Sequence, residues 1–127
     1  MAKILVVDDN ELVRATTRAM LQGAGHEVEE TGDGNAAVAF VDKTPPDLVL
    51  TDLVMPIKGG VALIRELRRT GYRGAIIAMS GGGGDTGPSA LLNMAREQGA
   101  DDCVSKPFHR SDLFARVTAA LELRRAS

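Results

Sequence analysis

Short apolar runs alternate with longer amphipathic stretches along the whole chain. Five runs have the length and composition of strands, although the second is weakly apolar: residues 4–7, 27–31, 47–51, 75–79 and 102–105. Five stretches carry apolar residues at helical spacing: residues 11–22, 35–43, 60–69, 88–98 and 111–125. The buried stripe of the first helix is predicted at Leu12, Val13, Met20 and Leu21. Ser111 is the predicted N-cap of the last helix.

Five strand–helix units in succession predict an α/β fold. Strands flanked by helices of this length indicate a parallel sheet that is covered on both faces. Right-handed crossovers then give a doubly wound, five-stranded sheet, with the flavodoxin-like strand order 2-1-3-4-5. We find no linker and no internal repeat, so we expect one domain over residues 1–127. The glycine-rich stretch at residues 81–87 is predicted to be a flexible loop.

Polar side chains follow four of the five predicted strands. Asp8 and Asp9 follow the first strand, Asp52 the third, Ser80 the fourth and Lys106 the fifth. Ligands of open α/β sheets bind at the carboxyl ends of the strands. A 2-1-3-4-5 order places the first and third strands side by side, so we expect these side chains on one rim.

The charges on this rim indicate a particular chemistry. Adjacent carboxylates repel each other unless a cation lies between them, and three carboxylates form a hard oxygen site suited to Mg²⁺. A carboxylate there can attack phosphorus, provided that Mg²⁺ and a lysine offset the negative charge of the phosphoryl group. Asp8 and Asp9 alone could instead be acids favoured by a helix N-terminus. Together with Asp52 and Lys106 they favour phosphorylation of an aspartate.

Several motifs occur in order at these strand ends: "VVDDNE" at 6–11, "DLVLTDLVMP" at 47–56, Gly59, "AMS" at 78–80 and "GADDCVSKPF" at 99–108. With them the chain resembles a response-regulator receiver domain of the CheY-like family over essentially its whole length. The resemblance implies a phosphoacceptor in two-component or phosphorelay signalling, a signalling domain and not a turnover enzyme. It also implies a histidine kinase or histidine phosphotransfer protein as the phosphoryl donor.

The resemblance assigns a metal site and a phosphoacceptor. It implies that Asp52 accepts the phosphoryl group and contributes to binding of Mg²⁺. Asp9 is then expected to ligate Mg²⁺ directly, and Asp8 through water. The backbone carbonyl of Val54 is the further ligand that the family pattern implies.

The resemblance also implies contacts to the phosphoryl group. Lys106 is expected to pair with Asp52 and then with its phosphoryl group, and Ser80 to close on that group. The Lys106–Pro107 bond is expected to be cis. The downstream protein target is expected to bind the surface formed by residues 88–125.

Four positions depart from the family pattern. Cys103 stands where an aromatic ring usually moves with the Ser or Thr, and Lys58 replaces the usual acid before the loop glycine. Val54 and Gly82 stand two residues after Asp52 and Ser80, and neither side chain can orient an attacking water molecule. Our hypothesis is that a phosphoryl group on Asp52 is therefore long-lived.

Composition excludes several other functions. The net charge of −2, from 15 basic and 17 acidic residues, provides no overall positive potential that would attract nucleic acid or an anionic membrane. No apolar run is long enough to span a bilayer. The single cysteine cannot form an internal disulfide, so we expect a reducing, cytoplasmic location.

Three other functions remain as alternatives. A haloacid dehalogenase-type, Mg²⁺-dependent phosphatase needs a second acid two residues after the first, where Asn10 stands. A flavin-binding flavodoxin-like domain needs a hydroxyl- and glycine-rich loop after the first strand. A degenerate receiver that acts only as a docking module would not need the phosphorylation residues that are present here.

Overall fold

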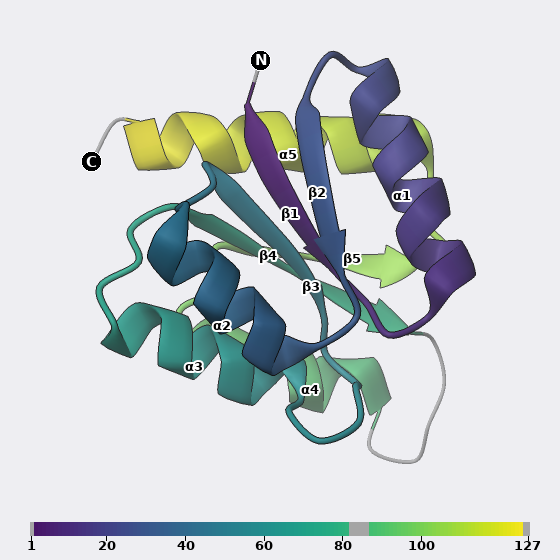
Figure 1. The fold of residues 1–127 in the computed structure, drawn as a ribbon. Helices are drawn as coiled ribbons and strands as arrows, with labels where there is room; N and C mark the ends of the chain where they lie inside the picture. The colour runs from purple at the N-terminus through teal and green to yellow at the C-terminus, as the bar shows by residue number, and fades with distance from the viewer. Residues whose placement is uncertain (1, 82–86, 126–127) are drawn as a thin grey trace.

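A computed structural model describes residues 2–81 and 87–125 as five strands that alternate with five helices (Figure 1). The strands are β1 (Lys3–Val7), β2 (Glu27–Thr31), β3 (Leu48–Asp52), β4 (Ala75–Gly81) and β5 (Asp102–Lys106). The helices are α1 (Glu11–Gly23), α2 (Gly34–Lys43), α3 (Gly60–Arg69), α4 (Gly87–Gln98) and α5 (Arg110–Arg125).

All neighbouring strands of the sheet are parallel, in the order β2-β1-β3-β4-β5. This arrangement confirms the strand order predicted from the sequence. The central strand β3 is buried along its whole length, as its run of apolar residues indicates. Because β1 and β3 are adjacent, with Val7 opposite Thr51, the residues that follow them emerge side by side.

Two apolar layers cover the two faces of the sheet. Helices α2, α3 and α4 pack on one face, whereas α1 and α5 pack on the other (Figure 1). Successive residues of β1 alternate between the layers: Leu5 and Val7 join the first core, and Ile4 and Val6 the second. Both faces of β1 are therefore buried, which fixes its register and the position of the residues after it.

Two local features set the geometry of the loops beside the carboxyl ends of the strands. Asn10 is the N-cap of α1, and its side chain accepts a hydrogen bond from the amide of Val13 at 3.0 Å. At the start of α3, a Cβ on Gly60 would lie 2.2 Å from the carbonyl oxygen of Asp52. Only glycine allows α3 to begin this close to the end of β3.

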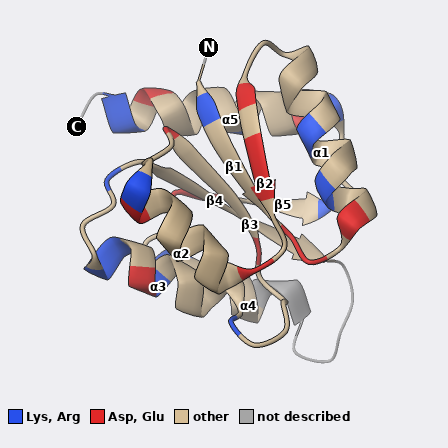
Figure 2. Ribbon diagram, in the orientation of Figure 1, with Lys and Arg blue, Asp and Glu red and all other residues tan. Residues whose placement is uncertain are grey.

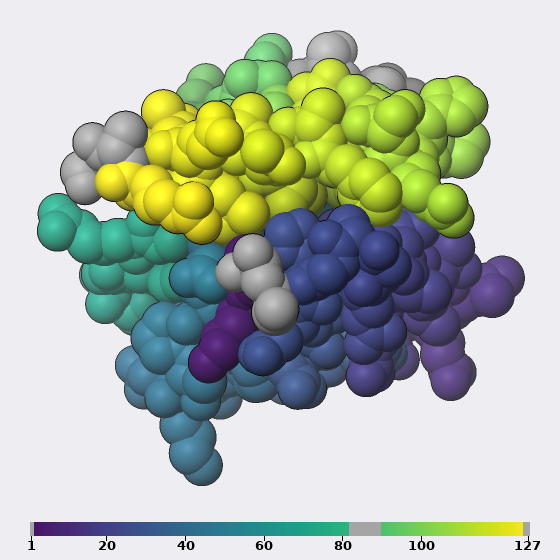
Figure 3. Space-filling view, turned by 90° about the horizontal axis from the view of Figure 1, so that it is seen from above, coloured from purple at the N-terminus to yellow at the C-terminus, as the bar shows by residue number. Residues whose placement is uncertain are grey.

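A half-buried ion cluster ties the elements together at the opposite end of the sheet, where the strands begin. The Asp101 carboxylate accepts hydrogen bonds from Arg124 at 2.6 and 3.0 Å and from Arg68 at 3.2 Å. Arg68 also donates to the carbonyls of Tyr72 and Gly99. Figure 3 looks onto this edge, with α5 in yellow across the upper half of the view. The cluster joins α3 and α5 to the segment before β5.

Some sequence-based expectations were wrong in detail. Leu12 is 76% exposed, because α1 turns Thr17 and Leu21 toward the sheet and leaves Leu12 on its outer side. Ser111 is not the cap of α5, since this helix begins at Arg110 and the carbonyl of His109 accepts from Leu113 at 3.0 Å. The part of the predicted flexible loop at residues 82–86 lies outside the described residues.

Candidate metal and phosphoryl site

The turn between β1 and α1 carries the first two acidic residues. Asp8 is fully buried, and its Oδ1 accepts a hydrogen bond from the amide of Asn10 at 2.9 Å. Its Oδ2 accepts from the Lys106 ammonium at 2.6 Å. Asp9 is exposed, and no donor in the described part of the chain bonds to its carboxylate. Asn10, and neither aspartate, is the N-cap of α1.

The third acid, Asp52, is the last residue of β3, not the first residue after it. It is 7% exposed, and its Oδ1 accepts from the amide of Leu53 at 3.0 Å and lies 3.4 Å from the Lys106 ammonium. Burial raises the pKa of the Asp52 carboxyl above its ordinary value, and the negative charge of Asp8 adds to this effect, whereas Lys106 opposes it. A buried acid beside a second carboxylate is the kind of group that binds a further cation.

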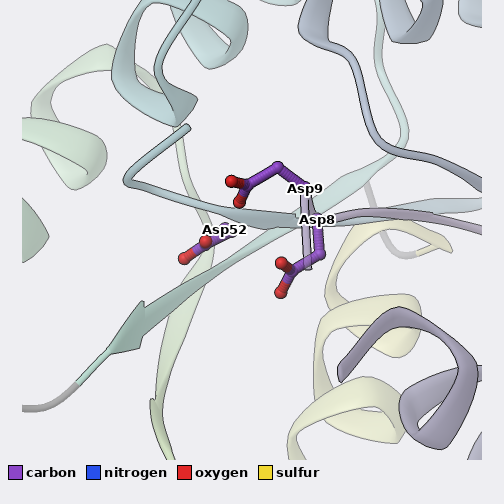
Figure 4. Close-up of side chains that lie close together, drawn as sticks. All are labelled: Asp8, Asp9 and Asp52. Atoms are coloured by element: carbon purple, nitrogen blue, oxygen red, sulfur yellow. The ribbon is translucent and has the colours of Figure 1, made fainter. Parts of the chain in front are cut away.

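The three carboxylates converge at the ends of β1 and β3 (Figure 4). Asp8, Asp9 and Asp52 each place one oxygen atom within 4.8 Å of the others. Figure 2 shows the same concentration of acid where the chain leads from β1 into α1. Clustered carboxylate oxygens form a hard donor set, so these residues fit Mg²⁺.

The neighbouring strands supply the other predicted groups. Lys106 ends β5, opposite Gly81 of β4, and its ammonium bridges Asp8 and Asp52. Ser80 lies within β4 because parallel pairing with β5 continues through Gly81. Its side chain is buried, and its hydroxyl donates to the carbonyl of Gly81 at 3.3 Å. The lysine thus contacts the acids directly, whereas the structure gives the serine no bond to them.

The loop after β3 holds two positions singled out from the sequence. Val54 follows Asp52 by two residues in the loop after β3 and is 65% exposed. Lys58, which replaces the usual acid, forms an ion pair with Glu66 of α3 and packs its stem beside Gly34. The Lys58 charge is therefore already paired within the chain. The Lys106–Pro107 bond is cis, as the resemblance implied.

Cys103 occupies β5 opposite Ala78 and is 7% exposed. It belongs to the core between the sheet and α4, and burial raises the pKa of its thiol. These features are those of a small buried strand residue and argue against a reactive thiolate. The position that an aromatic ring usually takes is filled here by a small side chain.

The sequence analysis missed Arg14 of α1. Its guanidinium donates to the backbone carbonyl of Asp8 at 2.8 Å and to the Glu30 carboxylate at 2.9 Å. Arg14 lies one helical turn after Asn10 and faces Glu30 on β2. This ion pair could be predicted from the sequence only if the register of α1 against β2 were known. The contact of Arg14 with a carbonyl cannot be read from residue type.

A hollow of about 740 Å³ lies at the other end of the molecule. The loops after α2 and α3 and the end of α5 line it, including Tyr72 and Arg124. None of the clustered aspartates lines this hollow.

Fold and site together define a class of protein: a doubly wound α/β domain with acids and a lysine at the carboxyl ends of its strands. The sequence matches the family described as response regulator receiver domain over residues 4–118, and the chain belongs to this family. Receiver domains are the signalling domains of two-component response regulators. Among the described residues, no helix is long and apolar enough to cross a membrane.

Curated relatives and solved structures agree with this assignment. The chain is 33% identical over 121 residues to the virulence transcriptional regulatory protein PhoP of Salmonella choleraesuis. That alignment covers 95% of this chain and 52% of the relative, so the chain spans about half of the relative's length. The structure resembles FixJ-N, with a TM-score of 0.87 and 29% identity over 96% of this chain and 94% of that one. It also resembles a putative response regulator of Chloroflexus aurantiacus, with a TM-score of 0.87 and 28% identity over 95% and 98% of the two chains.

Proposed function

We propose that this receiver domain accepts a phosphoryl group on Asp52 in the presence of Mg²⁺. The observation that carries the proposal is the cluster itself: three carboxylate oxygens within 4.8 Å of one another, with the Lys106 ammonium bonded to one of the acids. Asp52 is the phosphoacceptor because it lies in the middle of the rim, where the buried strand β3 holds it in place.

The clustered carboxylates support a proposed set of metal ligands. Asp9 and Asp52 would hold Mg²⁺ directly, Asp8 through water, and the Val54 carbonyl would complete the protein ligands. Bound Mg²⁺ supplies positive charge that lets the phosphoryl oxygens approach the carboxylates. Asp9 suits direct ligation, because no described donor competes for its exposed carboxylate.

The transfer itself requires one bond to form and one to break. An oxygen of the Asp52 carboxylate attacks phosphorus, and the P–N bond of the donor phosphohistidine breaks, so that the imidazole leaves with the bonding electron pair and takes a proton. Lys106, 3.4 Å from Asp52, offsets charge on the phosphoryl oxygens. Ser80 then donates its hydroxyl to the new phosphoryl group in place of the 3.3 Å bond to Gly81.

The partners follow from this chemistry. The phosphoryl donor is a sensor histidine kinase or a histidine phosphotransfer protein in the cytoplasm, and the domain accepts one group per chain and does not turn substrate over. The downstream partner is a protein that contacts α4, β5 and α5, the surface of residues 88–125. The continuous sheet and the family match over residues 4–118 support one receiver domain over residues 1–127.

The experiment is measurement of the intact mass after incubation with acetyl phosphate, with and without Mg²⁺. We expect one added phosphoryl group with Mg²⁺ and none without it. Asp52→Asn should abolish the addition, whereas Asp47→Asn, which changes the acid just before β3, should leave it intact. Addition to Asp52→Asn would contradict the choice of acceptor.

A second measurement separates the alternative of a docking module. If the mass is unchanged, titration with Mg²⁺ by calorimetry decides between two outcomes. Metal binding would indicate a receiver that requires its own kinase as donor. Absence of binding would reject the proposed site and favour a module that works without phosphorylation.

A further inference from the structure

Arg14 links the acidic turn to the edge of the sheet. Its Nη1 donates to the backbone carbonyl of Asp8 at 2.8 Å, while its Nε donates to Glu30 Oε1 of β2 at 2.9 Å. Arg14 thus connects three elements: the β1–α1 turn, α1 and the edge strand β2. Its side chain is only 18% exposed, so the contact is largely shielded from water.

Neighbouring residues support this placement of the arginine. Arg18 donates to the other oxygen of Glu30 at 3.0 Å, so both carboxylate oxygens are engaged. The paired guanidinium groups lower the pKa of Glu30, with Arg14 as the largest cause. Gly32 provides the space, since a Cβ at that position would lie 2.8 Å from the Arg14 Nη1. The glycine therefore lets the guanidinium reach the Asp8 carbonyl.

We propose that Arg14 is a positioning residue for the metal site: it holds the backbone of the β1–α1 turn so that the Asp8 and Asp9 carboxylates face Asp52. This inference rests on the proposed Mg²⁺ site. Two other bonds shape the same turn, namely Asp8 N–H to the Thr31 carbonyl at 3.1 Å and Asn10 N–H to Asp8 Oδ1 at 2.9 Å. Arg14 is the side chain that bonds to the Asp8 carbonyl in the described structure, and its second bond, to Glu30, ties that carbonyl to β2.

Positioning and simple electrostatics predict opposite results. A guanidinium bonded to the Asp8 carbonyl repels a nearby divalent cation, so charge alone predicts that removal of Arg14 strengthens Mg²⁺ binding. Positioning predicts weaker binding, because a turn that has lost one of its three anchoring bonds spends less time with the Asp8 and Asp9 carboxylates facing Asp52. Mutation of residues that hold metal ligands in place typically weakens metal binding by about 10–100-fold.

The test compares Arg14→Met with Arg18→Met by Mg²⁺ calorimetry. Arg18 is the matched control, because it lies on the same helix and bonds the same glutamate but has no bond to the Asp8 carbonyl. We expect Arg14→Met to raise the Kd for Mg²⁺ about tenfold, and Arg18→Met to change it less than about twofold. In the metal-free protein, hydrogen exchange at the Asn10 amide should accelerate in Arg14→Met alone.

Gly32→Ala keeps the arginine but displaces its guanidinium, and it provides a second variant if Arg14→Met folds poorly. We expect weaker Mg²⁺ binding in this variant too. Unchanged or tighter binding in a folded Arg14→Met or Gly32→Ala protein would overturn the inference while leaving the proposed function intact. A wild-type protein that binds no Mg²⁺ would overturn both, so the two failures are distinguishable.

Discussion

Lys106 donates a 2.6 Å hydrogen bond to Asp8, although 98 positions separate the two residues in the chain. All strands of the sheet are parallel, so β1 and β5 end at the same rim although β3 and β4 lie between them. The Lys106 side chain crosses this rim to reach Asp8. Asp8 is fully buried, so its carboxylate depends on this cation and on the Asn10 amide. Lys106 therefore offsets the charge of the acids that the proposed metal would also bind.

This relationship predicts that Lys106→Met has opposite effects on stability and metal affinity. Loss of the cation leaves Asp8 buried and unpaired, so the metal-free protein should lose about 3 kcal/mol of unfolding free energy. The Kd for Mg²⁺ should fall several-fold, because the ammonium no longer repels the ion. Urea unfolding with and without Mg²⁺ and calorimetry measure both effects. Lys58→Met, which removes a lysine paired with Glu66, is the control, and weaker Mg²⁺ binding by Lys106→Met would contradict the argument.

Tyr72 predicts how the protein responds to alkaline pH. It is 9% exposed, and its hydroxyl donates to the carbonyl of Pro46 at 2.8 Å. Burial raises the pKa of Tyr72, and the neutral phenol is thus favoured in the native state. A native state that holds the proton more tightly than the unfolded chain is stabilised fully below the ordinary phenol pKa of about 10. That stabilisation is lost as the pH rises above this value.

The measurement is unambiguous, because the chain has one Tyr and no Trp. We expect the phenolate absorbance to appear together with unfolding above pH ~10, and not as a separate native titration. Tyr72→Phe should cost about 1 kcal/mol at neutral pH through the lost hydrogen bond. It should also remove this group's share of the alkaline destabilisation. A native-state titration at the ordinary pKa would show that the phenol is accessible to water.

The sequence was sufficient for the parts of the molecule that depend on periodicity. Apolar runs such as residues 4–7 and 47–51 predicted the strands to within about a residue, and the acids after β1 and β3 predicted the site. The buried face of a helix was harder to predict. Leu12 is apolar and was expected in the core, but the packing of α1 on the sheet leaves it exposed. Strand ends were also misjudged, since pairing between β4 and β5 extends β4 past Ser80. Arg14 was missed because its acceptor is a backbone carbonyl.

Ile57 carries local backbone strain in the loop between β3 and α3. It has a φ of 71°, in the left-handed region that costs a β-branched residue about 1–2 kcal/mol. Its side chain is 96% exposed, so packing offsets little of this cost. We therefore expect Ile57→Asn to raise the unfolding free energy by about 1 kcal/mol. Ile57→Gly should gain less, because glycine loses more conformational entropy on folding.

Urea unfolding checks this prediction, with Leu12→Asn as the control. Leu12 is also an exposed apolar residue, but it lies in the regular helix α1, so its replacement relieves no strain. We expect no gain in stability from that change. A loss of stability in Ile57→Asn would mean that the isoleucine side chain makes contacts that stabilise the loop.

The lifetime of the phosphoryl group depends on which side chains border Asp52. Hydrolysis needs a water molecule aligned on phosphorus, and a polar side chain that holds and deprotonates such water typically accelerates proton-transfer steps by about 10²–10⁴-fold. Val54 is apolar and 65% exposed at the rim, so it cannot hold that water. Gly82, the other position identified from the sequence, has no side chain and lies outside the described residues.

We therefore expect slow loss of phosphate from the purified protein, and Val54→Glu should shorten the lifetime about tenfold by supplying a carboxylate that orients water. The measurement is the decay of the phosphorylated mass after acetyl phosphate is removed, at constant Mg²⁺. Val54→Leu is the control, because it keeps the rim apolar and the backbone carbonyl in place, and its lifetime should match that of the wild type. Rapid decay in the wild type would show that another group in the chain activates water, and the side chains nearest to Asp52 would then be the first candidates.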